Sequence, residues 1–212
     1  MFTKTNDSER IAGWNTAADW HELRGRLTVA ADRKLWHMAF EQFFLTRLEL
    51  RYLHPIKTLQ DNGTFTGEGF AIAAIQCSLV EFLESTVQGL NFRHRQNGRL
   101  GPHEYSSSGT IFKSFLTRRV PFSGAFSSTL AADFYLNVRC SLFHEARTKG
   151  WRIHARDVQG RIVDSSTKTL FRDHFQDALL AFIQQYGRDL IENPTYQAAF
   201  VRKFDDLCEP AG

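Results

Sequence analysis

Apolar residues return every three or four positions along several long stretches, and this period constrains the fold more than any other feature of the chain. Between residues 133 and 150 the stripe consists of Phe134, Val138 and Leu142. A single buried helical face requires this spacing, so the stretch is predicted to be an amphipathic helix. The same period predicts four further helices, over residues 32–53, 69–91, 169–191 and 195–207.

Polar and conformationally special residues suggest where these helices begin and end. Asp32 is a suitable N-cap for the first long helix, and Pro55 is expected to break or kink it, leaving residues 56–60 as a separate turn. Thr129 or a close neighbour is expected to start the central helix. Gly150 is its predicted stop, since glycine favours the left-handed conformation that ends many helices.

One part of the chain has the pattern of β-structure. Residues 151–158 partly alternate between apolar and polar, and Gln159-Gly160 can turn them into residues 161–164. The predicted fold is therefore mostly all-α: a helical bundle of four to five main helices with one small β-hairpin at about 151–164. Residues 1–31 are expected to form a lead-in segment, and 32–212 a single helical domain. The 19 Phe residues are expected to fill its core.

Composition places the chain among folded proteins, with 42% hydrophobic and 23% charged residues. Uninterrupted apolar runs are far shorter than the ~20 residues that span a bilayer. Residues 1–9 carry acidic groups and no apolar run, so no secretion signal is expected. Cys77, Cys140 and Cys208 stand far apart and fit reduced thiols. A cytoplasmic protein without a membrane partner is predicted.

Several familiar catalytic signatures do not occur in the sequence. It has no Gly-rich phosphate loop, and His144-Glu145 lacks the second histidine of a zinc-protease motif because Thr148 stands in its place. No metal and no cofactor are predicted. The net charge of +3 is weak evidence for a nucleic-acid partner.

Arg139 and His144 are the remaining candidates, five residues apart on the central helix. On an ideal helix they are separated by ~7.5 Å along the axis and by a net rotation of ~140°. They therefore lie on adjoining sides. The spacing alone fits a surface arginine and a marginal histidine as well as it fits a site.

The segment Asn137-Val138-Arg139-Cys140-Ser141-Leu142-Phe143-His144 resembles the R-x4–6-H signature of HEPN domains, which are helical bundles found in bacterial and archaeal defence and toxin–antitoxin ribonucleases. The resemblance extends over about residues 32–191, although only the motif helix is specific. It implies a HEPN-like domain in residues 32–212 and metal-independent RNA cleavage at a composite site made by two protomers. It also implies a cytoplasmic endoribonuclease in phage defence or a toxin–antitoxin system.

The resemblance implies a role for each candidate residue. His144 would act as the acid or base on the ribose 2′-OH, and Arg139 would hold the phosphate. The predicted partners are RNA, a second copy of the chain, and an antitoxin or neutralising protein. Supporting polar groups would be Asn137, Ser141 and Glu145, and cations guiding the RNA backbone would be Arg147, Lys149, Arg152, Arg93, Arg95 and Arg99.

Cys140 departs from the family pattern, in which the residue after the arginine is often Asn, Asp or His. A thiol is a weak hydrogen-bonding group. Two other interpretations therefore remain open. One is a non-catalytic HEPN-like module that binds RNA, a nucleotide or a partner protein. The other is a helical scaffold in which Arg139 and His144 form a buried polar pair.

Overall fold

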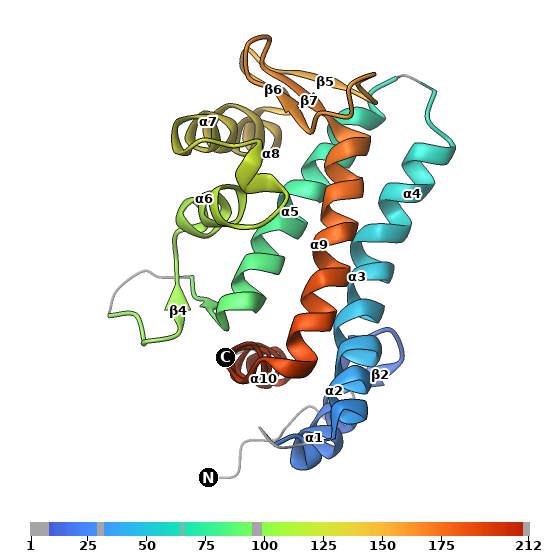
Figure 1. Cartoon of the computed structure of the whole chain (residues 1–212), viewed down its shortest axis with the longest axis vertical. Helices are drawn as coiled ribbons and strands as arrows, with labels where there is room; N and C mark the ends of the chain where they lie inside the picture. The colour runs from blue at the N-terminus through green and yellow to red at the C-terminus, as the bar shows by residue number, and fades with distance from the viewer. Residues whose placement is uncertain (1–8, 29–31, 65, 95–98, 210–212) are drawn as a thin grey trace. The chain divides into compact units, whose positions relative to one another are not determined.

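A computed structural model describes residues 9–28, 32–64, 66–94 and 99–209 of the chain. The protein is mostly helical, as the apolar periods predict, with three small sheets among the described residues (Figure 1). The chain forms two compact units. Unit 1 comprises Met1–His54, Ser85–Ser106 and Tyr186–Gly212, and unit 2 comprises Pro55–Glu84 and Ser107–Gln185. Two 21-residue helices, α5 (Glu68–Gln88) and α9 (Arg172–Glu192), contribute residues to both units.

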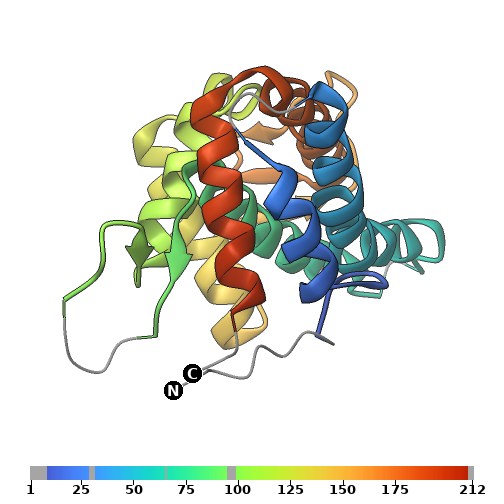
Figure 2. The ribbon, with the colours of Figure 1, turned by 90° about the horizontal axis from the view of Figure 1, so that it is seen from below.

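Unit 1 is built around an aromatic core. Trp20 is fully buried, and its ring centroid lies 5.2 Å from those of Phe43 and Phe204. Trp20 Nε1 also donates to Asp205 Oδ1 at 2.9 Å, so α1 and α10 lie side by side (Figure 2). The elements wholly within unit 1 are β1 (Arg10–Ala12), β2 (Asn15–Thr16), α1 (Ala17–Arg26), α2 (Arg33–Ala39), η1 (Phe40–Leu45), α3 (Thr46–Leu48), η2 (Glu49–Leu53), β3 (Asn91–Phe92), β4 (Glu104–Tyr105) and α10 (Pro194–Cys208).

Asp32 caps α2, as predicted, because its Oδ1 accepts a hydrogen bond from Lys34 N at 3.0 Å. Pro55 does not break the helix, and the separate helical turn predicted over residues 56–60 is wrong. Helical segments follow one another from α2 into α4 (His54–Asp61), and Pro55 is the second residue of α4. The helix α4 directly follows the π-helical segment η2, where His54 N–H bonds to Glu49 O, five residues back. The regular α-helical hydrogen bonding is already interrupted there, so the absence of a backbone N–H at Pro55 is tolerated.

Unit 2 contains the helix with the predicted Arg/His pair. Ser127 caps this helix through a hydrogen bond from Leu130 N to its Oγ at 3.1 Å, two residues before the predicted start at Thr129. The elements wholly within unit 2 are α6 (Ser108–Arg118), η3 (Phe122–Gly124), α7 (Ser128–Phe134), η4 (Tyr135–Cys140), α8 (Ser141–Glu145), β5 (Arg152–His154), β6 (Val163–Asp164) and β7 (Thr169–Phe171).

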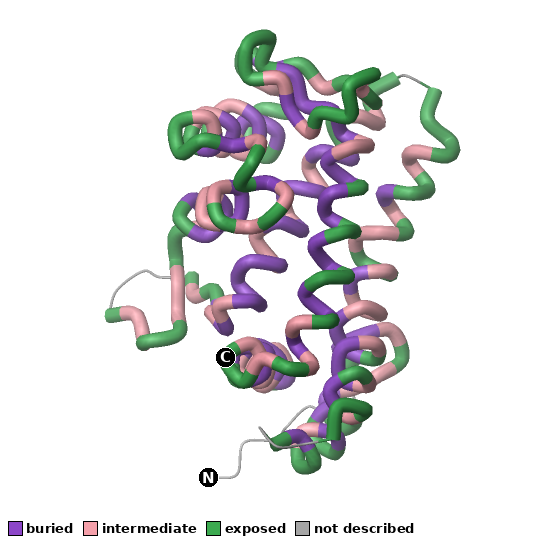
Figure 3. Tube along the Cα trace, viewed as in Figure 1, coloured by how far each residue is buried: buried purple, intermediate pink, exposed green. Residues whose placement is uncertain are grey.

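The predicted hairpin over 151–164 is wrong in its pairing. Both extended segments exist, as β5 and β6, but β7 lies between them. β5 pairs with β7 in parallel and β6 pairs with β7 antiparallel. All three residues of β7 are buried, since it is the central strand. Residues 169–171 therefore form this strand instead of the first turn of α9. The connection over 158–161 is exposed (Figure 3).

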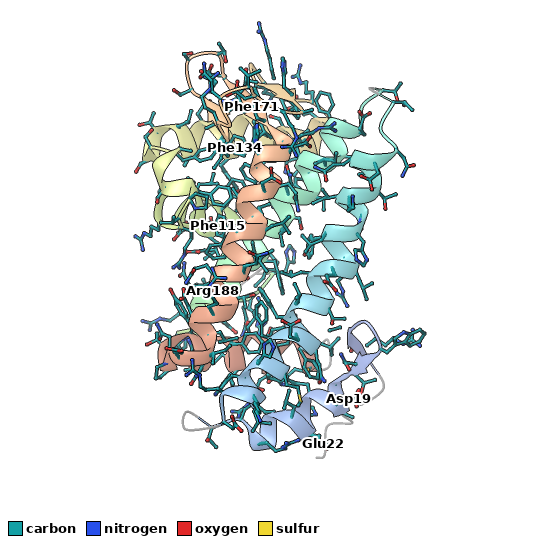
Figure 4. The ribbon with its side chains drawn as sticks, turned by 45° about the vertical axis from the view of Figure 1, so that its right-hand side comes forward. Asp19, Glu22, Phe115, Phe134, Phe171 and Arg188 are labelled. Carbon is teal, nitrogen blue, oxygen red and sulfur yellow. The ribbon has the colours of Figure 1, made fainter. Side chains whose placement is uncertain are left out.

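Aromatic side chains form the core of unit 2, in agreement with the prediction for Phe. Phe134 stacks on Phe175 of α9 with their ring centroids 6.1 Å apart, and it meets the Trp151 ring edge-on at 5.0 Å. Phe115 meets Phe182 of α9 at 4.8 Å. Phe115 and Phe134 are labelled beside α9 in Figure 4. Such edge-to-face and offset pairs add to the stabilisation that burial provides.

Within the described residues, α5 is one helix that is long and apolar enough to cross a membrane. Most of this stretch is buried inside the structure. Its Glu84 has no exposed surface and forms an ion pair with Arg119 of unit 2. These are features of the core helix of a water-soluble protein.

Candidate functional site

The motif helix runs without a break through α7, η4 and α8, from Ser128 to Glu145. Phe134 and Val138 are fully buried and Leu142 is 9% exposed, which confirms the predicted apolar face. The helix ends at Ala146, which has a left-handed φ of 54°, and not at Gly150. The chain then turns back, because Lys149 N donates to Asn137 O at 2.8 Å.

The middle of this helix is a π-helical segment, η4. Ser141 Oγ donates to Leu136 O, five residues back, at 3.2 Å, and so uses a carbonyl within this wider turn. Segments of this kind are uncommon and occur often at functional sites. Arg139 is the fifth of the six residues of η4.

Arg139 is largely buried and held between three side chains. Its Nη2 donates to Glu81 Oε2 of α5 at 3.2 Å. Its guanidinium carbon lies 4.8 Å from the centre of the Phe143 ring and 5.7 Å from that of Tyr135, within cation–π range. The side chain is 20% exposed. Its buried Nε has no hydrogen-bond partner among the described residues.

His144 lies in the last turn of the helix and is exposed to solvent. The structure gives its ring no hydrogen bond or ion pair to the described residues. Arg139 and His144 therefore occupy one helix but share no direct polar contact there. One cation is fixed by packing, and the imidazole is open to a ligand.

The three predicted supporting groups bond elsewhere. Asn137 Nδ2 donates to Asp133 Oδ1 at 2.9 Å, and Ser141 bonds to its own helix. Glu145 forms ion pairs with Lys149 and Arg147, and hydrogen bonds from these two cations lower the pKa of its carboxyl group. In the described structure none of the three bonds to Arg139 or His144.

Cys140 lies in a cluster of polar groups beside the arginine. Burial raises the pKa of Tyr135, the Ser108 hydrogen bond at 3.0 Å lowers it, and a hydrogen bond with Cys140 raises it. Burial also raises the pKa of Cys77 to about 12, although the charge of Arg139 acts in the opposite direction. Cys77 is therefore a neutral thiol at cellular pH.

The predicted RNA-guiding cations differ in their surroundings. Arg147 and Lys149 are tied to Glu145, whereas the exposed Arg152 has no side-chain partner among the described residues. In unit 1, Arg93 is bound to Glu104 and Asp206. Arg99, also in unit 1, is exposed, and Arg95 lies outside the described residues.

Glu81, Tyr135 and Phe143 surround Arg139, and the sequence did not single them out. Tyr135 and Phe143 lie four residues to either side of Arg139, so the i, i+4 rule could have identified them. Glu81 is 58 residues away in sequence, and no local pattern links it to Arg139. Within the described residues, no group of three His, Cys, Asp or Glu side chains could hold a metal ion.

Comparison with protein-family models, with curated proteins and with solved structures gives no match. The assignment of a function therefore depends on the residues themselves.

Proposed function

We propose that the protein is a cytoplasmic, metal-independent endoribonuclease of the HEPN type, acting in phage defence or as part of a toxin–antitoxin system. The observation that carries this proposal is the placement of Arg139 and His144 on one helix, with the arginine anchored by Glu81 and the imidazole open to solvent. The resemblance of residues 137–144 to the HEPN signature supports it. The π-helical segment that contains Arg139 is a second, weaker support.

The chemistry needs one acid–base group and one fixed cation. His144 would remove the proton from a ribose 2′-OH, whose oxygen then attacks the adjacent phosphorus and expels the 5′-oxygen of the next nucleotide, which takes up a proton from the imidazolium or from water. The products are a 2′,3′-cyclic phosphate and a free 5′-OH. Arg139 would stabilise the added negative charge on the phosphorane. It can do so while paired, because a guanidinium carries five N–H donors and the Glu81 bond uses one.

The proposed catalyst is a homodimer in which two motif helices provide one site. Leu136 is 62% exposed and Phe143 is 49% exposed, although both belong to the motif helix. Exposed apolar groups beside a candidate site favour an interface. The two-fold pairing would bring a second Arg139 and His144 to the same RNA.

The decisive experiment measures cleavage of diverse single-stranded and structured RNAs by purified protein in excess EDTA. We expect products that end in a 2′,3′-cyclic phosphate, and no cutting where the target ribose lacks its 2′-OH. His144→Ala should abolish cleavage in a protein that remains folded. The matched control is His21→Ala, because His21 is an exposed helical histidine of unit 1.

Full activity of His144→Ala, or the absence of any cleavage across the RNA set, would refute the proposal. Sedimentation of the same samples gives the oligomeric state. A monomeric protein with full activity would contradict the composite site.

A non-catalytic HEPN-like module is the second candidate, and two observations favour it. Arg139 is already neutralised by Glu81, and Cys140 replaces the polar group of the family pattern. Such a module would bind RNA, a nucleotide or a protein partner such as an antitoxin without turnover. Its signature is saturable RNA binding by fluorescence anisotropy that survives His144→Ala.

A further inference from the structure

A cavity of about 410 Å³ opens at the N-terminal end of α5, within unit 2. Its walls come from three segments: Gly67 to Phe70 at the start of α5, Ile153 to Arg156 at and after β5, and Arg172 at the start of α9. The volume lies in the range of small-molecule sites. Neither Arg139 nor His144 lines it.

Arg172 is a buried cation with an unused donor in this cavity. Its side chain is 8% exposed, and its Nη1 is buried without a hydrogen bond among the described residues. Glu68 Oε1 lies 3.9 Å from Nη1, and Asp173 Oδ1 lies 3.7 Å from Nε, so both carboxylates are beyond hydrogen-bonding distance. A buried donor left without a partner is costly, and an anion bound here would satisfy it.

The first turn of α5 provides a second attraction for an anion. The helix dipole makes this end positive, although one N–H of the first turn is already used, because Phe70 N donates to Gly67 O at 3.0 Å. Two glycines keep the turn open. A Cβ added to Gly67 would meet no atom within 4 Å, and one added to Gly69 would lie 3.4 Å from Ile153 Cγ2 and 3.7 Å from Arg172 Nη1. The space between the helix end and the guanidinium is therefore not filled by a side chain at position 69.

Further charges and one aromatic ring complete the cavity. His154 and Arg156 are exposed at its edge, and Arg156 forms ion pairs with Asp173 at 3.5 Å and Asp177 at 3.3 Å. Glu68 is an opposing charge, although its Oε2 accepts a hydrogen bond from Thr66 N at 3.0 Å. The Phe70 side chain lines the cavity and is 43% exposed, so it offers an apolar surface.

We propose that this cavity binds the phosphate group of a small phosphate monoester of mononucleotide size. The phosphate would lie between Arg172 Nη1 and the N-terminal end of α5, whose dipole is positive there, and Arg156 belongs to the lining of the same cavity. The apolar part of the ligand would pack on Phe70. This site is independent of Arg139 and His144 and of the proposed RNA cleavage.

The test is isothermal titration of the full chain with AMP, inorganic phosphate and adenosine, each up to ~10 mM. We expect AMP and phosphate to bind and adenosine to bind at least about tenfold more weakly than AMP, because the charged contacts are made by the phosphate. AMP binding more tightly than inorganic phosphate supports packing on Phe70. Equal affinities of AMP and inorganic phosphate would refute the packing of the ligand on Phe70.

Three variants separate a ligand site from a structural arginine. Arg172→Met should weaken AMP binding at least about tenfold, and Glu68→Gln should strengthen it, because the opposing charge is removed. Arg26→Met is the control, since Arg26 is exposed on α1 of unit 1. If Arg172→Met does not fold, the Glu68→Gln result still decides. Adenosine binding as well as AMP, no binding in folded protein, or unchanged affinity in Glu68→Gln overturns the proposal.

Discussion

Removing Arg119 should destabilise the protein strongly, because it leaves a buried carboxylate without its cation. Glu84 of α5 has no exposed surface. Arg119 Nε donates to its Oε2 at 2.7 Å, and Arg119 Nη2 donates to its Oε1 at 3.1 Å. Ser114 Oγ adds a third hydrogen bond, also to Oε1, at 2.7 Å. The perturbation is Arg119→Met, which keeps much of the side-chain volume and removes the charge.

The loss of one partner from a buried ion pair costs roughly 3–5 kcal/mol. The lower end applies here, because the Arg119 side chain keeps 21% exposure and Ser114 still binds the carboxylate. For a chain of this length, about 3 kcal/mol corresponds to a fall in Tm of roughly 6–12 °C. Urea unfolding followed by circular dichroism gives the free energy, and calorimetry gives Tm.

Two comparisons make the prediction refutable. Arg33→Met removes an ion pair whose two side chains are mostly exposed, so it should cost less than about 1 kcal/mol. Glu84→Gln combined with Arg119→Met removes both charges and should recover most of the loss. A loss below about 1 kcal/mol in Arg119→Met, or a double variant less stable than the single one, would refute the buried ion pair.

Three further predictions concern local features. Burial raises the pKa of Asp133, but hydrogen bonds from three side chains outweigh it and lower the pKa below the usual value. Its stabilisation is therefore complete above pH ~4 and lost as the pH falls through the lowered pKa, so the stability gap between wild type and Asp133→Asn should shrink on acidification. Gly89→Ala should lower the free energy of unfolding in urea by more than about 1 kcal/mol, because φ is +63° and the new Cβ would lie 2.7 Å from Ala199 Cα. Gly25→Ala is the control and should not destabilise the protein, because its new Cβ would meet no atom within 4 Å. Cys77 should resist iodoacetamide at pH 8 until the chain unfolds, since its pKa is about 12.

The sequence predicted the helices of this fold better than their ends. The stripe of Phe134, Val138 and Leu142 is buried as expected, because apolar residues at this helical spacing share one face, which packs into the core. The end of the motif helix was not predicted, since Ala146 takes a left-handed φ that alanine rarely adopts. Pro55 was misjudged for a similar reason, because the π-helical segment before it depends on backbone hydrogen bonds that leave no local sequence pattern.

Pairings between distant segments were the other limit of sequence reasoning. β7 inserts between β5 and β6 through a parallel pairing that a local turn signal cannot indicate. The partners of the candidate site residues were hidden in the same way. No local pattern distinguishes Glu81 or Arg172 from the other charged residues of their helices. Their significance arises only where two helices meet.

The environment of Arg139 is the point on which both candidate functions depend. Glu81 and the two aromatic rings restrict the guanidinium to one position, which removes the entropy that a free arginine would lose on binding phosphate. The same carboxylate weakens the electrostatic attraction for phosphate, because it compensates the charge of the guanidinium. Fixing the guanidinium helps a catalytic arginine only if N–H donors remain for the phosphate. A structural arginine needs no donors for a ligand. The Nη2 bond to Glu81 uses one donor and Nε is buried, so the donors that remain for a phosphate are the other N–H groups of Nη1 and Nη2. The exposed His144 lies on the same helix, and its ring is accessible to a ligand.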